Sequence, residues 1–486
     1  MSITIPPHET SGSFESGATN AITEDIGSMN LGREMASFPL MDLPHELVIE
    51  IFQFATIVHG RQANAVCPLL LGKICRSWRA VVFETCTFWR EVNLIIDPHA
   101  FFTQISLLAE WTARAGGSPL SVSIIDPKNT LKLEASEEDL TCLFDLLQNL
   151  SPQTRSLDLE IPDFVYDRWV VRGLDDYSWP LLSNLALSTT MGSSDLSHPS
   201  DRLNFSSCPV LTSVTIKAFY HHYIYLPWRS LLHIHFDSVF CSEIHTALES
   251  CPLLQTLVSE EIVEDRDTFS AKTIDHRSLK QLTLELDKNQ AGCDQCCRLL
   301  NSLRLPELRT LVLKLGLARP IRGFEFDIYP CISQSGCQLS ELTIEGATLK
   351  EKVLVDCLRL LPTLHTLQLS NNTWLNAHEE FIGLGPTSLS LMMAAGPDGL
   401  LMLPNLKALT ILGSLVGFSS KLVVELLASR WDTVEDDGTL AALQSVTIMP
   451  DLGHPNLGHM SPWRLEKDRQ VSFEDWRRRG YSVMAE

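Results

Sequence analysis

The stretch Pro306-Glu-Leu-Arg-Thr-Leu-Val-Leu313 contains the pattern that decides the fold of this 486-residue chain. Leucine follows the proline at the second, fifth and seventh positions. Because side chains alternate across a strand, Leu311 and Leu313 would point to the same side of a short strand. Proline lacks an N–H group and stops a preceding helix. The stretch therefore predicts the end of a helix followed by a strand with one buried face.

The same pattern returns along the chain from residue 152 onward, and the fifth residue after the proline is always Leu or Val. The prolines of these copies are Pro152, Pro180, Pro209, Pro252, Pro306, Pro362 and Pro404. Copies without the proline fill the gaps at residues 231–236, 279–284, 339–344 and 443–448. Between copies, apolar residues recur at helical spacing, as in Leu354, Cys357, Leu358 and Leu361. Each unit is thus predicted to be a strand and a helix.

Units of roughly 20 to 31 residues lie in the range of leucine-rich repeats. We therefore expect an α/β solenoid, an irregular array over residues 119–486 with parallel strands on its concave side. A compact doubly wound sheet is the alternative, but it would show longer all-apolar strands and few copies of one motif. A C-terminal cap is expected around Phe473, Trp476 and Arg477–Arg479.

Two apolar helical stripes precede the repeats. Leu47, Ile51 and Phe54 recur at helical spacing in the first stripe, and the second runs from Ile74 to Val82. Two short helices with broad apolar faces form a marginal core by themselves. We therefore expect part of these faces to be covered by a partner.

The segments LPHELVIEIF (43–52), KICRSWRAVV (73–82) and TFWREV (87–92) resemble the F-box, a helical module that docks on the Skp-type adaptor of cullin-RING ubiquitin ligases. The stretch RAGGSPLSVSI (114–124) is similar to the join in many fungal, basidiomycete-type F-box proteins with leucine-rich repeats, whereas HGRQANAVCP (59–68) is a longer connection than usual. The resemblance implies an F-box (38–93) and a helical linker (94–118), and the scarcity of large apolar residues before them predicts a disordered tail (1–37). The resemblance also implies a set of residues that pack partly in the module's own core and partly against the adaptor: Leu43, Pro44, Leu47, Ile51, Ile74, Cys75, Trp78 and Trp89.

The function implied by the resemblance is substrate recognition. The F-box would bind the adaptor, and through it a cullin, while the solenoid holds a protein target whose identity the sequence does not reveal. A leucine-rich-repeat scaffold without a ubiquitin role is the alternative. An enzyme is not expected, because the chain has no phosphate-binding Gly-Lys-Ser/Thr loop, no Gly-x-Ser-x-Gly elbow and no His-Glu-x-x-His pair.

The outward positions of the predicted strands are the candidate target-binding residues. They alternate with the buried leucines and form a polar wall of mixed charge on the concave side. Such residues also suit a half-exposed strand that binds nothing. The candidates are Lys217, His235, Glu285, Lys314 and Glu345.

Composition narrows the classes of partner. The 38 basic and 59 acidic residues give a formal charge of −21, which repels nucleic acid and anionic membrane surfaces. No transmembrane helix is expected, since prolines interrupt the most apolar stretch, residues 381–412. The 13 cysteines without a secretory signal fit reduced thiols in the cytoplasm or nucleus.

No metal or cofactor is expected from the cysteine and histidine spacings. Cys293, Cys296 and Cys297 lack a second pair of ligands nearby, so they are interpreted as buried or partly buried helix residues. His233 and His235 would share one face of a strand, and a third ligand for them would have to come from His221 or His222.

Overall fold

The computed structural model describes residues 40–56, 68–128, 131, 136–173, 177–189, 202–217, 223–265, 272–286, 290–315, 327–346, 350–371, 384–393, 401–413, 420–431, 443–449 and 482–485. The chain divides into two compact units, Met1–Val165 (unit 1) and Tyr166–Glu486 (unit 2). The expected tail (1–37) and the expected cap residues Phe473, Trp476 and Arg477–Arg479 lie outside the described residues.

Unit 1 combines helices with a short parallel sheet. Its helices are α1 (His45–Thr56), α2 (Pro68–Ile74), α3 (Arg76–Glu84), α4 (Phe101–Arg114) and α6 (Glu137–Leu150), and α7 (Asp163–Arg172) crosses into unit 2. Its strands pair in parallel in the order β1 (Glu91–Ile95), β2 (Leu120–Ile125) and β3 (Thr154–Glu160). The sheet therefore starts at Glu91, before the first residue of the expected array (119–486), because Val92 and Leu94 form a strand without a proline motif.

Trp89 packs between the helices that begin unit 1 and the first strand–helix repeat that follows them. Trp89 is fully buried, and its indole N–H donates a hydrogen bond to the carbonyl of Val82 in α3 (2.9 Å). Its ring lies edge-on to Trp111 of α4, with 4.7 Å between the ring centroids, and the guanidinium of Arg114 lies 5.0 Å from its centroid. Helices α3 and α4 thus pack on the same side chain.

Unit 2 is a series of strands and helices. Its main strands are β4 (Asn184–Ser188), β6 (Ser213–Lys217), β8 (His233–Phe240), β9 (Thr256–Val263), β11 (Gln281–Leu286), β13 (Thr310–Leu315), β14 (Glu341–Glu345), β15 (Thr366–Asn371), β16 (Ala408–Gly413), β17 (Ser445–Met449) and β18 (Ser482–Ala485). Its further helices are α8 (Cys241–Ser250), α9 (Gln290–Asn301), α10 (Tyr329–Ser335), α11 (Glu351–Arg359), α12 (Pro386–Met393) and α13 (Ser420–Trp431). Two small parallel sheets pair β5 (Leu203–Asn204) with β7 (Ile224–Tyr225), and β10 (Ile274–Asp275) with β12 (Leu303–Arg304).

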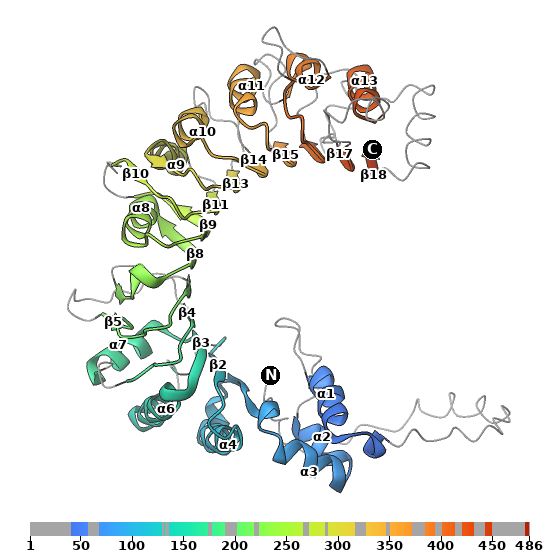
Figure 1. Cartoon of the computed structure of the whole chain (residues 1–486). Coiled ribbons are helices and arrows are strands. Elements are labelled where there is room, and N and C mark those ends of the chain that lie inside the picture. The colour runs from blue at the N-terminus through green and yellow to red at the C-terminus, as the bar shows by residue number, and fades with distance from the viewer. Residues whose placement is uncertain are drawn as a thin grey trace, which may run out of the picture. The chain divides into compact units, whose positions relative to one another are not determined.

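The main strands of unit 2 lie side by side in chain order, each parallel to the next. The order has no reversal point, so the sheet is not doubly wound. In unit 2, strands β8 to β18 follow the inner side of the curve and helices α8 to α13 follow the outer side (Figure 1). This confirms the α/β solenoid with parallel strands on the concave side.

The strand register places the motif leucines in two buried columns. The first column contains Leu282, Leu311, Leu342, Leu367 and Leu409, each directly beside the next. The second contains Leu284, Leu313, Ile344, Leu369 and Ile411. The residues between the two columns are half-buried, as the two-residue alternation predicts.

Each motif proline lies in a tight turn between the helical layer and the strand. The N–H of Leu308 donates to the carbonyl of Leu305 across Pro306 (3.1 Å), and Leu364 and Leu406 make the equivalent bonds across their own prolines. Proline suits this second turn position because its φ is already set. The residue that closes each turn, a leucine in every copy except Thr154 after Pro152, is buried, which explains the second position of the motif.

A recurring pair of backbone hydrogen bonds joins successive repeats at the point where a strand begins. The carbonyl of Lys280 accepts the N–H groups of both Arg309 (2.8 Å) and Thr310 (3.0 Å). The carbonyl of Arg309 does the same for Ser340 and Glu341 in the following unit. This doubled bond keeps neighbouring strands in register at their starts.

We expect Leu313→Ala to lower the free energy of unfolding by about 2 to 5 kcal/mol, because the side chain is fully buried in the second column and its loss leaves a cavity. Lys314→Ala is the matched control on the same strand and should cost less than about 1 kcal/mol, since Lys314 forms an exposed ion pair. Denaturant unfolding of both variants measures the difference. Equal losses would contradict the inward and outward assignment of this strand.

Candidate functional site

Helix α1 divides its apolar residues between a buried and an exposed side. Val48 and Phe52 are buried in unit 1, whereas Leu47 is 44% exposed, Ile51 is similar, and Phe54 is 79% exposed. The core of unit 1 therefore uses one part of the apolar face that the sequence predicts. The remaining part faces outward.

The second predicted stripe is interrupted at Cys75, so unit 1 has three short helices here instead of two. Cys75 caps the N-terminus of α3, and its Sγ accepts the N–H of Trp78 (3.4 Å). Helix α2 ends at Ile74, which is 59% exposed, and Leu70 is also exposed. Leu47, Ile51, Phe54, Leu70 and Ile74 are called the α1–α2 apolar set below.

The remaining residues of the predicted adaptor-binding set have three kinds of environment. Pro44 and Cys75 are exposed, and Leu43 is half-buried. Trp78 is half-buried because its ring packs on Phe52, with 4.6 Å between the centroids. Trp89 is fully buried and belongs to the core part of the set.

The predicted target-binding residues of unit 2 lie on neighbouring strands. Glu285, Lys314 and Glu345 are direct neighbours in β11, β13 and β14. Lys217 ends β6, and His235 lies on β8, the next strand of the sheet. All five side chains are half-buried, on the face opposite the leucine columns. We call them, with Asp237, Glu260 and Gln368, the concave polar row.

Polar contacts link the members of this row. The ammonium group of Lys314 lies 3.1 Å from Glu285 Oε2, and the Nε2 group of Gln368 donates to Glu345 Oε1 (3.0 Å). The hydrogen bond to Glu285 raises the pKa of Lys314, although burial acts against it, and the carboxylates of Glu285, Glu345 and Glu260 raise it further. The Lys314 charge is therefore held among acidic side chains.

Asp237 and Glu260 form a carboxyl pair at the β8–β9 junction. Partial burial and the hydrogen bond to Glu260 raise the pKa of Asp237. Burial alone would raise the pKa of Glu260 too, but its bond with Asp237 and the nearby His235 lower it. His235 Nε2 lies 2.9 Å from Glu260 Oε1. Asp237 is thus the carboxyl group of the pair that retains a proton more easily.

Glu260 was not among the candidate residues that the sequence indicated. In β9 the second inward position is Ser259, which is fully buried, instead of an apolar residue. The register between β9 and β11 also shifts at this point. Counting outward positions from Leu257 alone, as Val258 and Glu260, would have found it.

The cysteines of α9 are helix residues, of which Cys293 and Cys296 are buried and Cys297 is half-buried. Cys293 and Cys296 have no exposed surface, and burial raises the pKa of Cys293 to about 11 and that of Cys297 to about 12. Metal ligation requires thiolates. In the part of the chain that the structure describes, no three His, Cys, Asp or Glu side chains are grouped so that they could hold a metal ion. His221 and His222 lie outside it.

Comparison with known proteins does not assign the chain to a family. No protein-family model matches it, and no curated protein matches it either. Among the helices of the described ranges, none has the length and apolar character needed to cross a bilayer. The structure by itself shows a leucine-rich-repeat-like α/β array.

We expect Asp237→Asn to stabilise the chain at neutral pH but not in acid. Since the folded chain raises the Asp237 pKa, ionising this carboxyl group costs stability as pH rises through and above its ordinary range. Asparagine resembles the protonated form, so the gain should appear only where Asp237 is ionised and should stay below about 1 kcal/mol. Melting temperatures across pH measure it. Asp275→Asn, which removes the exposed partner of Arg277, is the control and should give no gain.

Proposed function

We propose that this chain is a substrate-recognition subunit of an SCF-type cullin-RING ubiquitin ligase. In this proposal α1, α2 and α3 bind a Skp-type adaptor, and the concave strands of unit 2 hold a protein target. The observation that carries the proposal is the exposed α1–α2 apolar set, of which Leu47, Ile51 and Ile74 lie in the segments that resemble the F-box.

Energetics favour a partner for these helices. Single exposed apolar residues are common on protein surfaces. Here, however, five large ones lie on one 12-residue and one 7-residue helix. Fully burying one such side chain contributes about 1.5 to 3 kcal/mol, so covering several of them supports a stable complex. Trp89 and Phe52 are buried without any partner, so the helices have a core of their own.

The concave polar row supports recognition of a protein. It extends over successive strands from β6 to β15 and carries both signs of charge. A broad surface of interspersed charges suits a protein partner, whereas a small molecule needs an apolar concave pocket with few polar groups. Complementary charges would then select the target and its orientation.

The mechanism is bridging. One end of the chain binds the adaptor and the other binds the target, so target lysines come close to a ubiquitin-loaded conjugating enzyme held by the same assembly. The gain is effective concentration and orientation. This chain contributes no bond-making group, and it acts in the cytoplasm or nucleus, where the ligase operates.

A triple substitution tests adaptor binding. Leu47→Ser, Ile51→Ser and Ile74→Ser together should weaken binding to a Skp-type adaptor at least about 100-fold, because each removes apolar area from the interface. The fold should persist, since all three side chains are exposed. Titration of the purified adaptor measures affinity, and circular dichroism checks the fold.

Leu360→Ser is the matched control, because Leu360 is 42% exposed on unit 2, close to the exposure of Leu47. It should leave adaptor affinity unchanged. Co-purification of a cullin with the tagged wild-type chain separates the ligase subunit from a leucine-rich-repeat scaffold without a ubiquitin role. Adaptor binding that survives the triple substitution would refute the proposed docking surface.

A fourfold charge reversal tests the target surface. Lys217, Glu285, Lys314 and Glu345 are replaced by residues of opposite charge, which should cost little stability because exposed ion pairs contribute at most about 1 kcal/mol each. Proximity labelling should then lose the partners that depend on this face, while adaptor binding stays intact. Unchanged labelling of every partner would show that recognition occurs elsewhere.

A further inference from the structure

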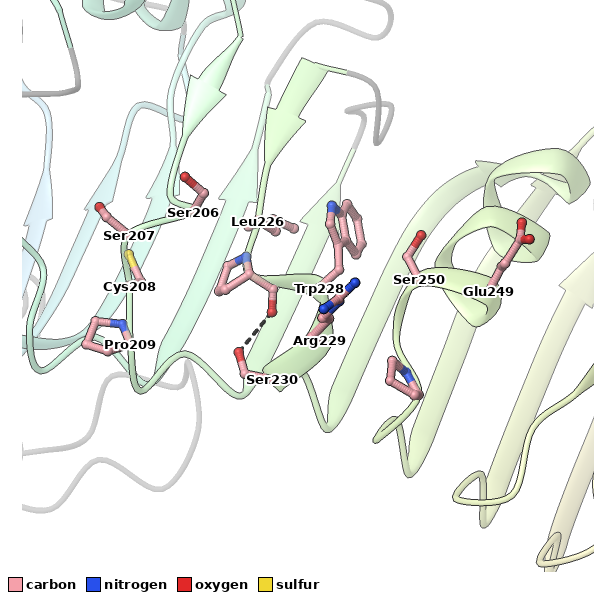
Figure 2. A pocket seen from close by; sticks show the side chains of 12 residues that line it. Ser206, Ser207, Cys208, Pro209, Leu226, Trp228, Arg229, Ser230, Glu249 and Ser250 are labelled. Atoms are coloured by element: carbon pink, nitrogen blue, oxygen red, sulfur yellow. Dashed lines mark hydrogen bonds between the residues drawn. The ribbon is translucent and has the colours of Figure 1, made fainter.

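The described residues between α7 and α8 differ from the rest of unit 2. In the described residues from 177 to 240 there is no α-helix, and the short strands β5 and β7 and the turn Trp228–Ser230 take its place. Figure 2 shows these short elements in front of the main strands, beside the helix that carries Glu249 and Ser250. The described outer elements here are thus short strands and a turn, whereas α8 to α13 cover the later strands.

Two adjoining hollows lie among these short elements and α8, with volumes of about 1050 and 310 Å³. Trp228 and Ser250 line both of them. The side chain of Trp228 stands between Leu226 and Ser250 (Figure 2). Two hollows with one side chain between them suit successive side chains of an extended polypeptide segment.

Two exposed apolar residues are sequence neighbours of prolines that line the larger hollow. Val210 and Leu253 follow the motif prolines Pro209 and Pro252, which line the larger hollow, and both are exposed. In later units the residue after the motif proline is polar: Glu307, Thr363 and Asn405. Tyr225, which lines the smaller hollow, is 47% exposed. Exposed apolar and aromatic side chains gathered around a hollow are typical of a protein contact.

Arg202 gives the smaller hollow a charge preference. Its guanidinium carbon lies 5.0 Å from the Tyr225 ring centroid, and its Nε is buried with no hydrogen-bond partner within the described ranges. A guanidinium group that lines a hollow binds a carboxylate with charge-assisted hydrogen bonds. An acidic side chain is therefore the complement that this position fits.

We infer that the hollows around Trp228 bind an extended segment of a partner protein that places an Asp or Glu side chain on Arg202. A neighbouring apolar side chain of the same segment enters the hollow beside Trp228. The site lies among β7, α8 and the turn between them, and it shares no residue with the concave polar row. It does not depend on a role in ubiquitin ligation.

Peptide selection tests the site. A phage-displayed library of short random peptides is panned on the full-length chain, and selected peptides are synthesised and titrated. We expect peptides with an Asp or Glu next to an apolar residue. Arg202→Gln should weaken their binding about tenfold or more because it removes a charge-assisted bond, and Tyr225→Ser should weaken it similarly because it removes the ring that packs on Arg202 and lines the hollow. Arg309→Gln, at an exposed arginine outside the hollows, is the matched control and should leave binding unchanged.

Several results would overturn the inference. They are the absence of any enriched peptide, enriched peptides without an acidic residue, and equal binding to Arg202→Gln and the wild-type chain. Concentration-dependent self-association abolished by Arg202→Gln would show that a second copy of this chain is the occupant. Adaptor binding should be the same for all these variants, so failure here is distinguishable from failure of the proposed function.

Discussion

The two buried columns of unit 2 can exist only if each strand lies beside the next without a slip in register. A shift by one residue would turn the leucines outward and the charged residues inward. The doubled bonds to the carbonyls of Lys280 and Arg309 fix the register where β13 and β14 begin. The turn across a motif proline connects the preceding segment to the start of its strand. Helix packing, the polar row and the hollows all depend on this alignment.

The sequence motif predicted the repeating strands and their two faces because the pattern is set by local alternation. It did not reveal β1, since Val92 and Leu94 lack the proline, nor the break at Cys75, since a cysteine cap does not disturb an apolar stripe. Glu260 was missed because Ser259 takes the place of an apolar residue on the buried side of β9. Trp228 does not belong to a repeating pattern in the sequence. Its position in the fold depends on contacts between successive repeats, which a local pattern does not predict.

The two proposed partner surfaces rest on different physics. The α1–α2 apolar set would gain affinity from water released on burial, and it would respond little to salt. The concave polar row is already paired internally, as Lys314 is with Glu285, so a target must exchange these contacts for its own. Such a surface contributes selectivity more than affinity. The α1–α2 apolar set would thus attach the chain to one fixed partner, and the concave polar row would select among targets.

The buried cysteines of the repeats react poorly with oxidants and alkylating reagents. Burial raises the pKa of Cys208, Cys251, Cys331 and Cys357 to about 12. Oxidants and alkylating reagents attack the thiolate, which is scarce in these residues at neutral pH. Among the cysteines of the described ranges, the exposed ones are Cys75 and Cys86, both in unit 1. Covalent labelling therefore begins at the helical end of the chain, where Cys75 borders Ile74 and reports whether that junction is covered.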